Sequence, residues 1–226
     1  MKLLKLLLSM IDYIVNCPAK LKDYWFKRNF SKIFGGFRDR KFTFVLDYYK
    51  NPNHVTFNMG SCNAFVLTYL SPLFDKYIGD YPNVILEKDL DNYHQTLILL
   101  GSPYTNNVTA GLLKNNKYVR FSGNQDQAKG IEILVTGYDK GPLLTEKGHY
   151  GIVLKLKNKY SDEHFLFFLA GLTNESTSAA GLLLRKNWDK IRKSIGRDEF
   201  LIVFKVDIPG DDTTYNVLFT QPRISM

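Results

Sequence analysis

Continuous apolar runs that stop abruptly at a glycine or an acid recur along the chain. The clearest is Leu97–Leu100, which is followed by a Gly-Ser-Pro sequence; Lys41–Asp47 and His164–Gly171 repeat the theme. A run of this kind is typical of a parallel strand buried on both faces. The polar residues after each run therefore mark a loop that opens where a strand ends.

Apolar residues at helical spacing follow each of these runs. We expect one helix that starts near Ser61 and ends near Pro72, and a second through Val108 and Leu113, with Thr105 or Asn106 as its cap. A third is expected over 179–191, after a loop at 172–178. Further strands are predicted at 83–87, at 131–135, at 150–157 with its lysines on a partly wet face, and at 199–206 and 215–219 as a hairpin.

This alternation predicts an α/β fold. We expect a three-layer Rossmann-like or flavodoxin-like arrangement, with a mostly parallel sheet, helices on both faces and a C-terminal antiparallel hairpin. A single α/β domain would cover 37–226. A basic amphipathic helical arm would precede it over 1–36, with Gly35 and Gly36 as the hinge.

The net charge of +8 is concentrated in this arm. Residues 1–41 carry ten cations and three acids, which leaves only +1 for the other 185 residues. The apolar stretch of 1–16 is interrupted by Asp12 and is too short to span a bilayer, and no secretory cleavage site follows it. We expect a helix that docks on its own domain, on a sister subunit of a homo-oligomer, on a protein partner or on an anionic membrane surface. Nucleic acid is disfavoured, because no aromatic and basic binding module is present.

The two cysteines, Cys17 and Cys62, form neither a CxxC motif nor a Cys/His cluster. A disulfide framework and a zinc site are therefore not indicated. With 45% hydrophobic residues, the chain can fill a real core. The interpretation that fits is an intracellular, cytoplasmic protein, peripheral at the membrane if the arm binds lipid.

Three strand-to-helix junctions share one chemistry. Each offers glycine for close backbone approach, hydroxyl or amide side chains, and helix amides that favour an anion. If the strands are parallel, all three lie at one sheet edge and converge on a ligand crevice. The alternative is that these residues only cap helices. The candidate binding residues are Gly60, Ser61, Asn63, Gly101, Ser102, Asn106, Gly171, Asn174, Ser176 and Thr177.

Two acids are the candidates for catalysis. Glu175 is expected in the loop after Gly171, where a carboxylate could act as base or nucleophile, and Asp47 would be its partner. The alternative for Glu175 is an exposed, solubilising acid. His149 could face the same crevice, but the histidines show no triad order or metal-ligand spacing. The dinucleotide fingerprint and the Walker A pattern are both absent, so the cofactor remains unknown.

Residues 97–184 also carry a resemblance. Gly101-Ser-Pro-Tyr-Thr-Asn106, Lys157-Asn-Lys-Tyr160, and Ala170-Gly171 followed by Ser176-Thr-Ser-Ala-Ala180 resemble a Rossmann-like module of archaeal surface-layer-like and bacterial regulatory proteins. That module reads Gly-Gly-Pro-x-x-Asn, Asn-Pro-Phe, then Ala-Gly and Gly-Thr-x-Ala-Ala. Ser102, Asn158-Lys159-Tyr160 and Ser176 depart from it. The resemblance implies the fold and the grouping of these loops, and it transfers no reaction.

Three functions follow as hypotheses. The first is a sensor or regulatory domain that binds a nucleotide or another phosphorylated small molecule over the carboxyl ends of the strands. The second is a nucleotide-processing hydrolase or transferase, of the deoxyribosyltransferase or NAD-glycohydrolase kind, that uses Glu175 or Asp47. The third is a non-catalytic scaffold like surface-layer modules.

Overall fold

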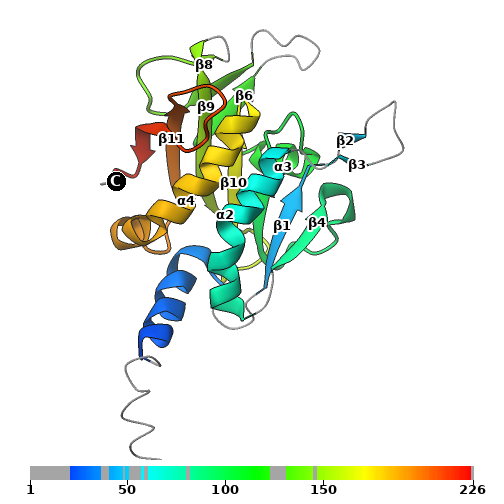
Figure 1. Ribbon diagram of the computed structural model, residues 1–226, viewed down its shortest axis with the longest axis vertical. Coiled ribbons are helices and arrows are strands. Elements are labelled where there is room, and N and C mark those ends of the chain that lie inside the picture. Colours follow the sequence, from blue (N-terminus) through cyan, green and yellow to red (C-terminus); the bar gives the residue numbers. More distant parts are fainter. Residues whose placement is uncertain are drawn as a thin grey trace, which may run out of the picture.

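The computed structural model describes residues 21–36, 41–47, 49–50, 57–58, 61–79, 82–122, 131–144 and 147–224, and all structural statements concern these residues. A seven-stranded sheet forms the centre of the fold (Figure 1), in the order β12-β11-β9-β10-β5-β1-β4. Its strands are β1 (Phe42–Leu46), β4 (Asn83–Leu86), β5 (Thr96–Leu100), β9 (His149–Lys157), β10 (Phe165–Gly171), β11 (Phe200–Val206) and β12 (Tyr215–Gln221).

Five of these seven strands run in one direction. Parallel pairs join β4, β1, β5 and β10, whereas β9 pairs antiparallel with both β10 and β11. The predicted mostly parallel α/β sheet with a C-terminal antiparallel pair, β11 and β12, is confirmed. The antiparallel insertion of β9 was not predicted. A connection of only seven residues, 158–164, joins β9 to β10, which is too short for a parallel crossover.

One face of the sheet is covered by three helices: residues 21–34, α2 (Ser61–Ile78) and α4 (Asn174–Ile195). In Figure 1, α2 and α4 lie side by side across this face. Gly181 of α4 allows the close approach, because a Cβ atom there would lie 2.9 Å from Val66 Cγ1 of α2. This face holds the larger part of the core.

The other face differs from the predicted helical layer. It is covered by the short helix α3 (Asn107–Leu113) and by a small sheet of β6 (Val119–Ser122), β7 (Glu132–Val135) and β8 (Leu143–Leu144). Apolar and polar residues alternate in this small sheet, a pattern that is typical of strands. The remaining elements are the pair β2 (Tyr49–Lys50) and β3 (Phe57–Asn58), and the 3₁₀ turn η1 (Glu87–Asp89).

Two predicted helix boundaries were wrong. Helix α2 continues through Pro72 to Ile78, because Phe74 and Tyr77 are buried against the core while Pro72 lies on the exposed side. Helix α4 starts at Asn174, so most of the predicted loop is helical. Thr173 and Ser176 form a reciprocal capping box that starts the helix there.

The helix at 21–34 is part of the domain at its C-terminal end. Phe30, Ile33 and Phe34 have no exposed surface, and Phe34 stacks on Phe167 at 5.1 Å. Gly35 and Gly36 are not a free hinge, because their amides donate to Ser31 and Glu163 carbonyls. The predicted domain boundary at residue 36 therefore separates this helix from the core on which its C-terminal end packs. Residues 1–20 of the predicted arm lie outside the described residues. Among the described helices, none is long and apolar enough to cross a bilayer.

Candidate functional site

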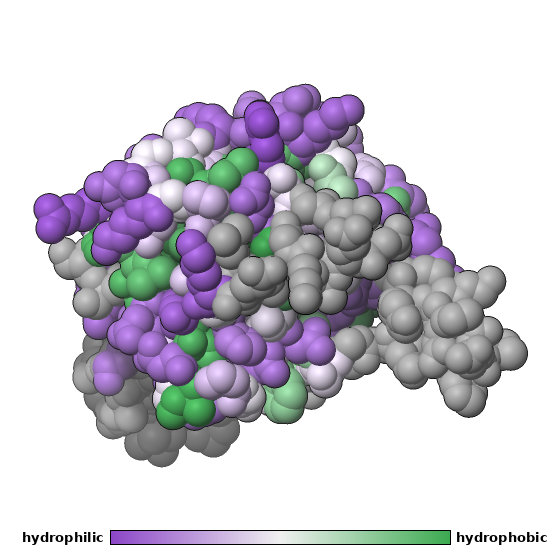
Figure 2. Space-filling model, turned by 90° about the horizontal axis from the view of Figure 1, so that it is seen from above, coloured by the Kyte–Doolittle hydropathy of each residue, from purple (hydrophilic) through white to green (hydrophobic). Residues whose placement is uncertain are grey.

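The carboxyl ends of the parallel strands meet where the chain changes direction in the sheet. From β1 the chain passes through α2 to β4 on one side, then returns to β5 on the other side of β1. Open α/β sheets bind ligands at such a switch point. Figure 2 looks down on this edge, and the coloured part of its surface is mainly hydrophilic with apolar areas between the polar residues.

A cavity of about 180 Å³ lies at this edge. All three predicted junctions contribute to its wall, from the ends of β1, β5 and β10 and the starts of α2 and α4. Its lining residues are Asp47, Cys62, Gly101, Ser102, Tyr104, Thr105, Ile131, Gly171, Leu172, Thr173, Asn174 and Thr177. This described lining contains one acid and no lysine or arginine.

Asp47 is the charged group of the cavity. Burial raises the pKa of its carboxyl, although hydrogen bonds from Asn63 and Thr105 act in the opposite direction. Asn63, fully buried on α2, donates its Nδ2 to Asp47 Oδ1. Gly101 brings the β5 end close, because with its φ of +96° a Cβ atom would lie 2.8 Å from Thr105 Oγ1. The carboxylate is thus held in one orientation at the cavity wall.

Cys62 lies beside Asp47 at the start of α2. Burial raises the pKa of its thiol to about 11, and the charge of Asp47 adds to the effect. Because the thiolate is the nucleophilic form, a thiol that stays protonated at neutral pH is not an activated nucleophile. Among the described residues, no group of histidine, cysteine and acid side chains could hold a metal ion.

The first turns of α3 and α4 are occupied by partners from the chain itself. In α3, Asn106 Oδ1 accepts from the Thr109 amide at 2.9 Å, and the Glu87 carboxylate accepts from the Asn107 amide. In α4, Thr173 accepts from the amides of both Ser176 and Thr177. The amides that we expected to face an anion are therefore largely satisfied internally.

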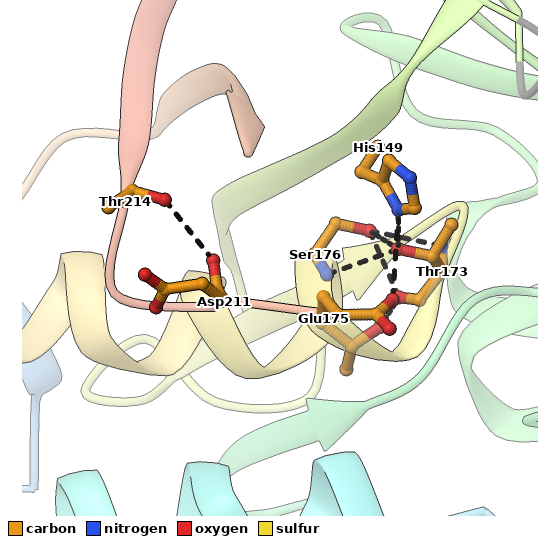
Figure 3. Close-up of polar contacts among 7 residues, drawn as sticks. His149, Thr173, Glu175, Ser176, Asp211 and Thr214 are labelled. Atoms are coloured by element: carbon orange, nitrogen blue, oxygen red, sulfur yellow. Dashed lines mark hydrogen bonds and ion pairs between the residues drawn. The ribbon is translucent and has the colours of Figure 1, made fainter. Parts of the chain in front are cut away.

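Glu175 lies in the first turn of α4 and not in a loop, and it does not line the cavity. Figure 3 shows it beside His149 at the start of β9, with Oε2 3.7 Å from His149 Nδ1. His149 Nδ1 also lies 3.1 Å from Thr173 Oγ1. Its own backbone amide, Thr173 and His149 lower the pKa of the Glu175 carboxyl. The two candidate catalytic acids thus do not share the cavity.

The other candidate residues fall into two groups: some line the cavity, and others hold the groups around it. Gly101, Ser102, Gly171, Asn174 and Thr177 line the cavity. Ser61 is the exposed first residue of α2, whereas Asn63, Asn106 and Ser176 are fully buried and hold other groups. Gly60 lies outside the described residues.

Sequence reasoning did not name four lining polar side chains as site residues: Cys62, Tyr104, Thr105 and Thr173. Each stands next to or within two positions of a named candidate, so widening every junction by two residues would have found them. No family model matches this chain, and no curated protein matches it either.

Proposed function

We propose that this chain is a small-molecule-binding regulatory domain, whose ligand is a nucleoside, nucleotide or related sugar-bearing molecule seated over the carboxyl ends of the parallel strands. The observation that carries the proposal is the Asp47 carboxylate, fixed by Asn63 and Thr105 in a cavity at the switch point.

The strand order supports a flavodoxin-like interpretation of the fold. Numbered among the parallel strands alone, β4-β1-β5-β10 runs 2-1-3-4. In flavodoxin-like sheets with this order, the ligand lies between the first and third strands. Asp47 and Gly101 follow the corresponding strands here.

The size and charge of the cavity limit the kind of ligand that it can hold. About 180 Å³ corresponds to roughly six water molecules and is below the ~300 Å³ that encloses a drug-sized ligand. The cavity therefore suits one sugar-sized part of a ligand. A carboxylate without a lysine or arginine in the described lining accepts hydrogen bonds from hydroxyl groups, so sugar hydroxyls would meet Asp47 while any phosphate stays outside.

Cleavage or transfer of a glycosyl group is the second candidate. The position of Asp47 favours it, since a carboxyl whose pKa burial raises, held at the cavity wall, can act as a general acid or base. Glu175 is the weaker candidate, because it pairs with His149 outside the cavity lining. A scaffold that binds no small molecule is the remaining alternative.

A thermal-shift and calorimetry panel on the full chain tests the proposal, with pentoses, nucleosides, nucleotides, cyclic nucleotides and sugar phosphates as probes. A ligand at 100 times its Kd adds about 2.7 kcal/mol to the free energy of unfolding. We expect Asp47→Asn to weaken binding at least tenfold. The matched control is Asp139→Asn, an exposed turn residue outside the cavity.

Four outcomes are informative. Binding that depends on Asp47 without product supports the regulatory domain, and chromatographic detection of a free base or transferred sugar supports the glycosyl reaction. Absence of binding across the panel would contradict the proposal and favour the scaffold, and equal binding by both variants would contradict it by placing the ligand away from Asp47.

A further inference from the structure

The outer end of the helix at 21–34 presents large apolar side chains to solvent. Leu21, Tyr24 and Trp25 are 51%, 52% and 52% exposed, whereas Phe30 and Phe34 in the same helix have no exposed surface. In Figure 1 this end of the helix extends below the sheet, away from the cavity edge. The helix therefore has an inner half that packs on the core and an outer half without a described partner.

We call Leu21, Tyr24 and Trp25 the aromatic tip, and exposed cations lie on the same helix. Lys22 and Arg28 are exposed on the same helix, and the Arg28 guanidinium lies 5.4 Å from the Trp25 ring centre. Lys27 is paired with Asp23 at 2.8 Å. Residues 21–34 carry four cations and one acid, a net charge of +3.

Aromatic side chains next to cations favour the interface of an anionic membrane. Tryptophan and tyrosine place an apolar ring and a polar edge at the boundary between lipid headgroups and acyl chains, while lysine and arginine attract anionic lipid. The sequence before the aromatic tip extends the same chemistry, since residues 1–20 contain Lys2, Lys5 and Lys20 among mainly apolar residues. We propose that the aromatic tip docks this protein on an anionic membrane surface.

The size of the aromatic tip argues against a second copy of the chain as its occupant. Three half-exposed side chains offer about 300 Å², whereas a stable protein interface takes about 800 Å² from each partner. A like-charged copy would also bring +3 against +3. An anionic lipid surface can bind the aromatic tip without a large complementary face, and its negative charge attracts the +3 charge of the helix.

Vesicle co-sedimentation of the full chain tests the proposal. The vesicles are phosphatidylcholine alone, or phosphatidylcholine with about 30 mol% phosphatidylserine, whose negative surface potential attracts basic segments. We expect at least tenfold stronger partition to the anionic vesicles, weakened at high salt because counterions screen the attraction. The variant with Leu21, Tyr24 and Trp25 all changed to Ala should lose at least tenfold.

A matched control is available. Phe65 on α2 is 51% exposed, so Phe65→Ala removes a similar exposed ring from another surface and should partition as the wild type does. Circular dichroism on each variant checks the fold. In a Trp188→Phe background Trp25 is the single tryptophan, and its fluorescence should shift to the blue only with anionic vesicles.

The proposal is overturned if the triple variant partitions like the wild type, which would place any lipid binding elsewhere in the chain. Equal partition to neutral and anionic vesicles would also overturn it. So would a dimer in analytical ultracentrifugation that the triple variant abolishes, combined with no vesicle binding, since the occupant would then be a second copy.

Discussion

Two ionisable side chains with shifted pKa values, Asp47 at the cavity edge and Lys155 toward the opposite ends of the strands, have different surroundings. At the cavity edge, Asp47 has Asn63 and Thr105 as hydrogen-bond donors. Toward the opposite ends of the strands, Lys155 on β9 has no exposed surface, and its Nζ reaches the Gly196 carbonyl only at 3.4 Å, 3.9 Å above the Phe165 ring centre. Burial, reinforced by Arg197, lowers the pKa of Lys155 to about 7. A partly buried ionisable group with an oriented set of partners beside a cavity indicates a site, whereas complete burial with few partners indicates a cost to stability.

The largest effect is expected from Lys155→Met. A pKa of 10.5 in the unfolded chain and about 7 in the fold corresponds to a penalty on the order of 5 kcal/mol at low pH. Between these values the unfolded chain binds more protons, so wild-type stability should rise as pH increases from about 7 to 10.5. The methionine variant should be more stable at pH 6 and should lack this rise.

Urea unfolding at pH 6 and pH 9 measures both quantities. Lys140→Met, at an exposed turn position, is the control and should keep the wild-type pH dependence. If Lys155→Met destabilises the fold at both pH values, the ammonium group contributes more through its contacts than its burial costs.

A smaller effect, and a loss of stability, is expected from Gly171→Ala at the cavity edge. A Cβ atom at Gly171 would lie 2.7 Å from the Thr177 amide nitrogen, so β10 and α4 would have to separate. Overpacking of this kind costs about 1–3 kcal/mol. Gly111→Ala on α3 is the matched control, because no atom lies within 4 Å of the added Cβ, and we expect it to be neutral or slightly stabilising. Equal melting temperatures for the two variants would show that the junction tolerates the extra atom.

Asn106→Ala separates capping from ligand binding. Asn106 Oδ1 caps α3 at the Thr109 amide, and its Nδ2 donates to the Leu100 carbonyl at 3.0 Å. Removing such a cap costs about 0.5–2 kcal/mol. Because Asn106 is buried and does not line the cavity, a ligand that binds through Asp47 should retain its Kd within threefold. A larger loss of affinity, measured by calorimetry on folded protein, would return Asn106 to the site.

The contrast between Asp47 and Lys155 also explains what the sequence could predict. Asp47, Gly101 and Gly171 follow apolar runs, and parallel pairing necessarily brings such positions together, so their meeting at one edge followed from the pattern. Whether a polar residue faces the cavity or caps a helix depends on the actual helix start, which is why Ser176 and Glu175 were misplaced. Lys155 stands in a strand whose lysines suggested a wet face, and only the packing of α4 and Arg197 around it makes it buried.

The smallest effect on stability is expected from Asp47→Asn. Since burial raises the pKa of the Asp47 carboxyl above its usual 3.8, the folded protein binds this proton more tightly than the unfolded chain does. The carboxyl therefore favours the fold at low pH and loses that advantage as pH rises through its folded pKa. The variant should match or exceed wild-type stability at pH 7, by less than about 1 kcal/mol, and lose this advantage on acidification. Chemical denaturation from pH 3.5 to 7 measures the difference. A large loss at pH 7 would mean that the carboxylate holds the strand ends together through Asn63 and Thr105, and the carboxylate would then be structural before it is a binding group.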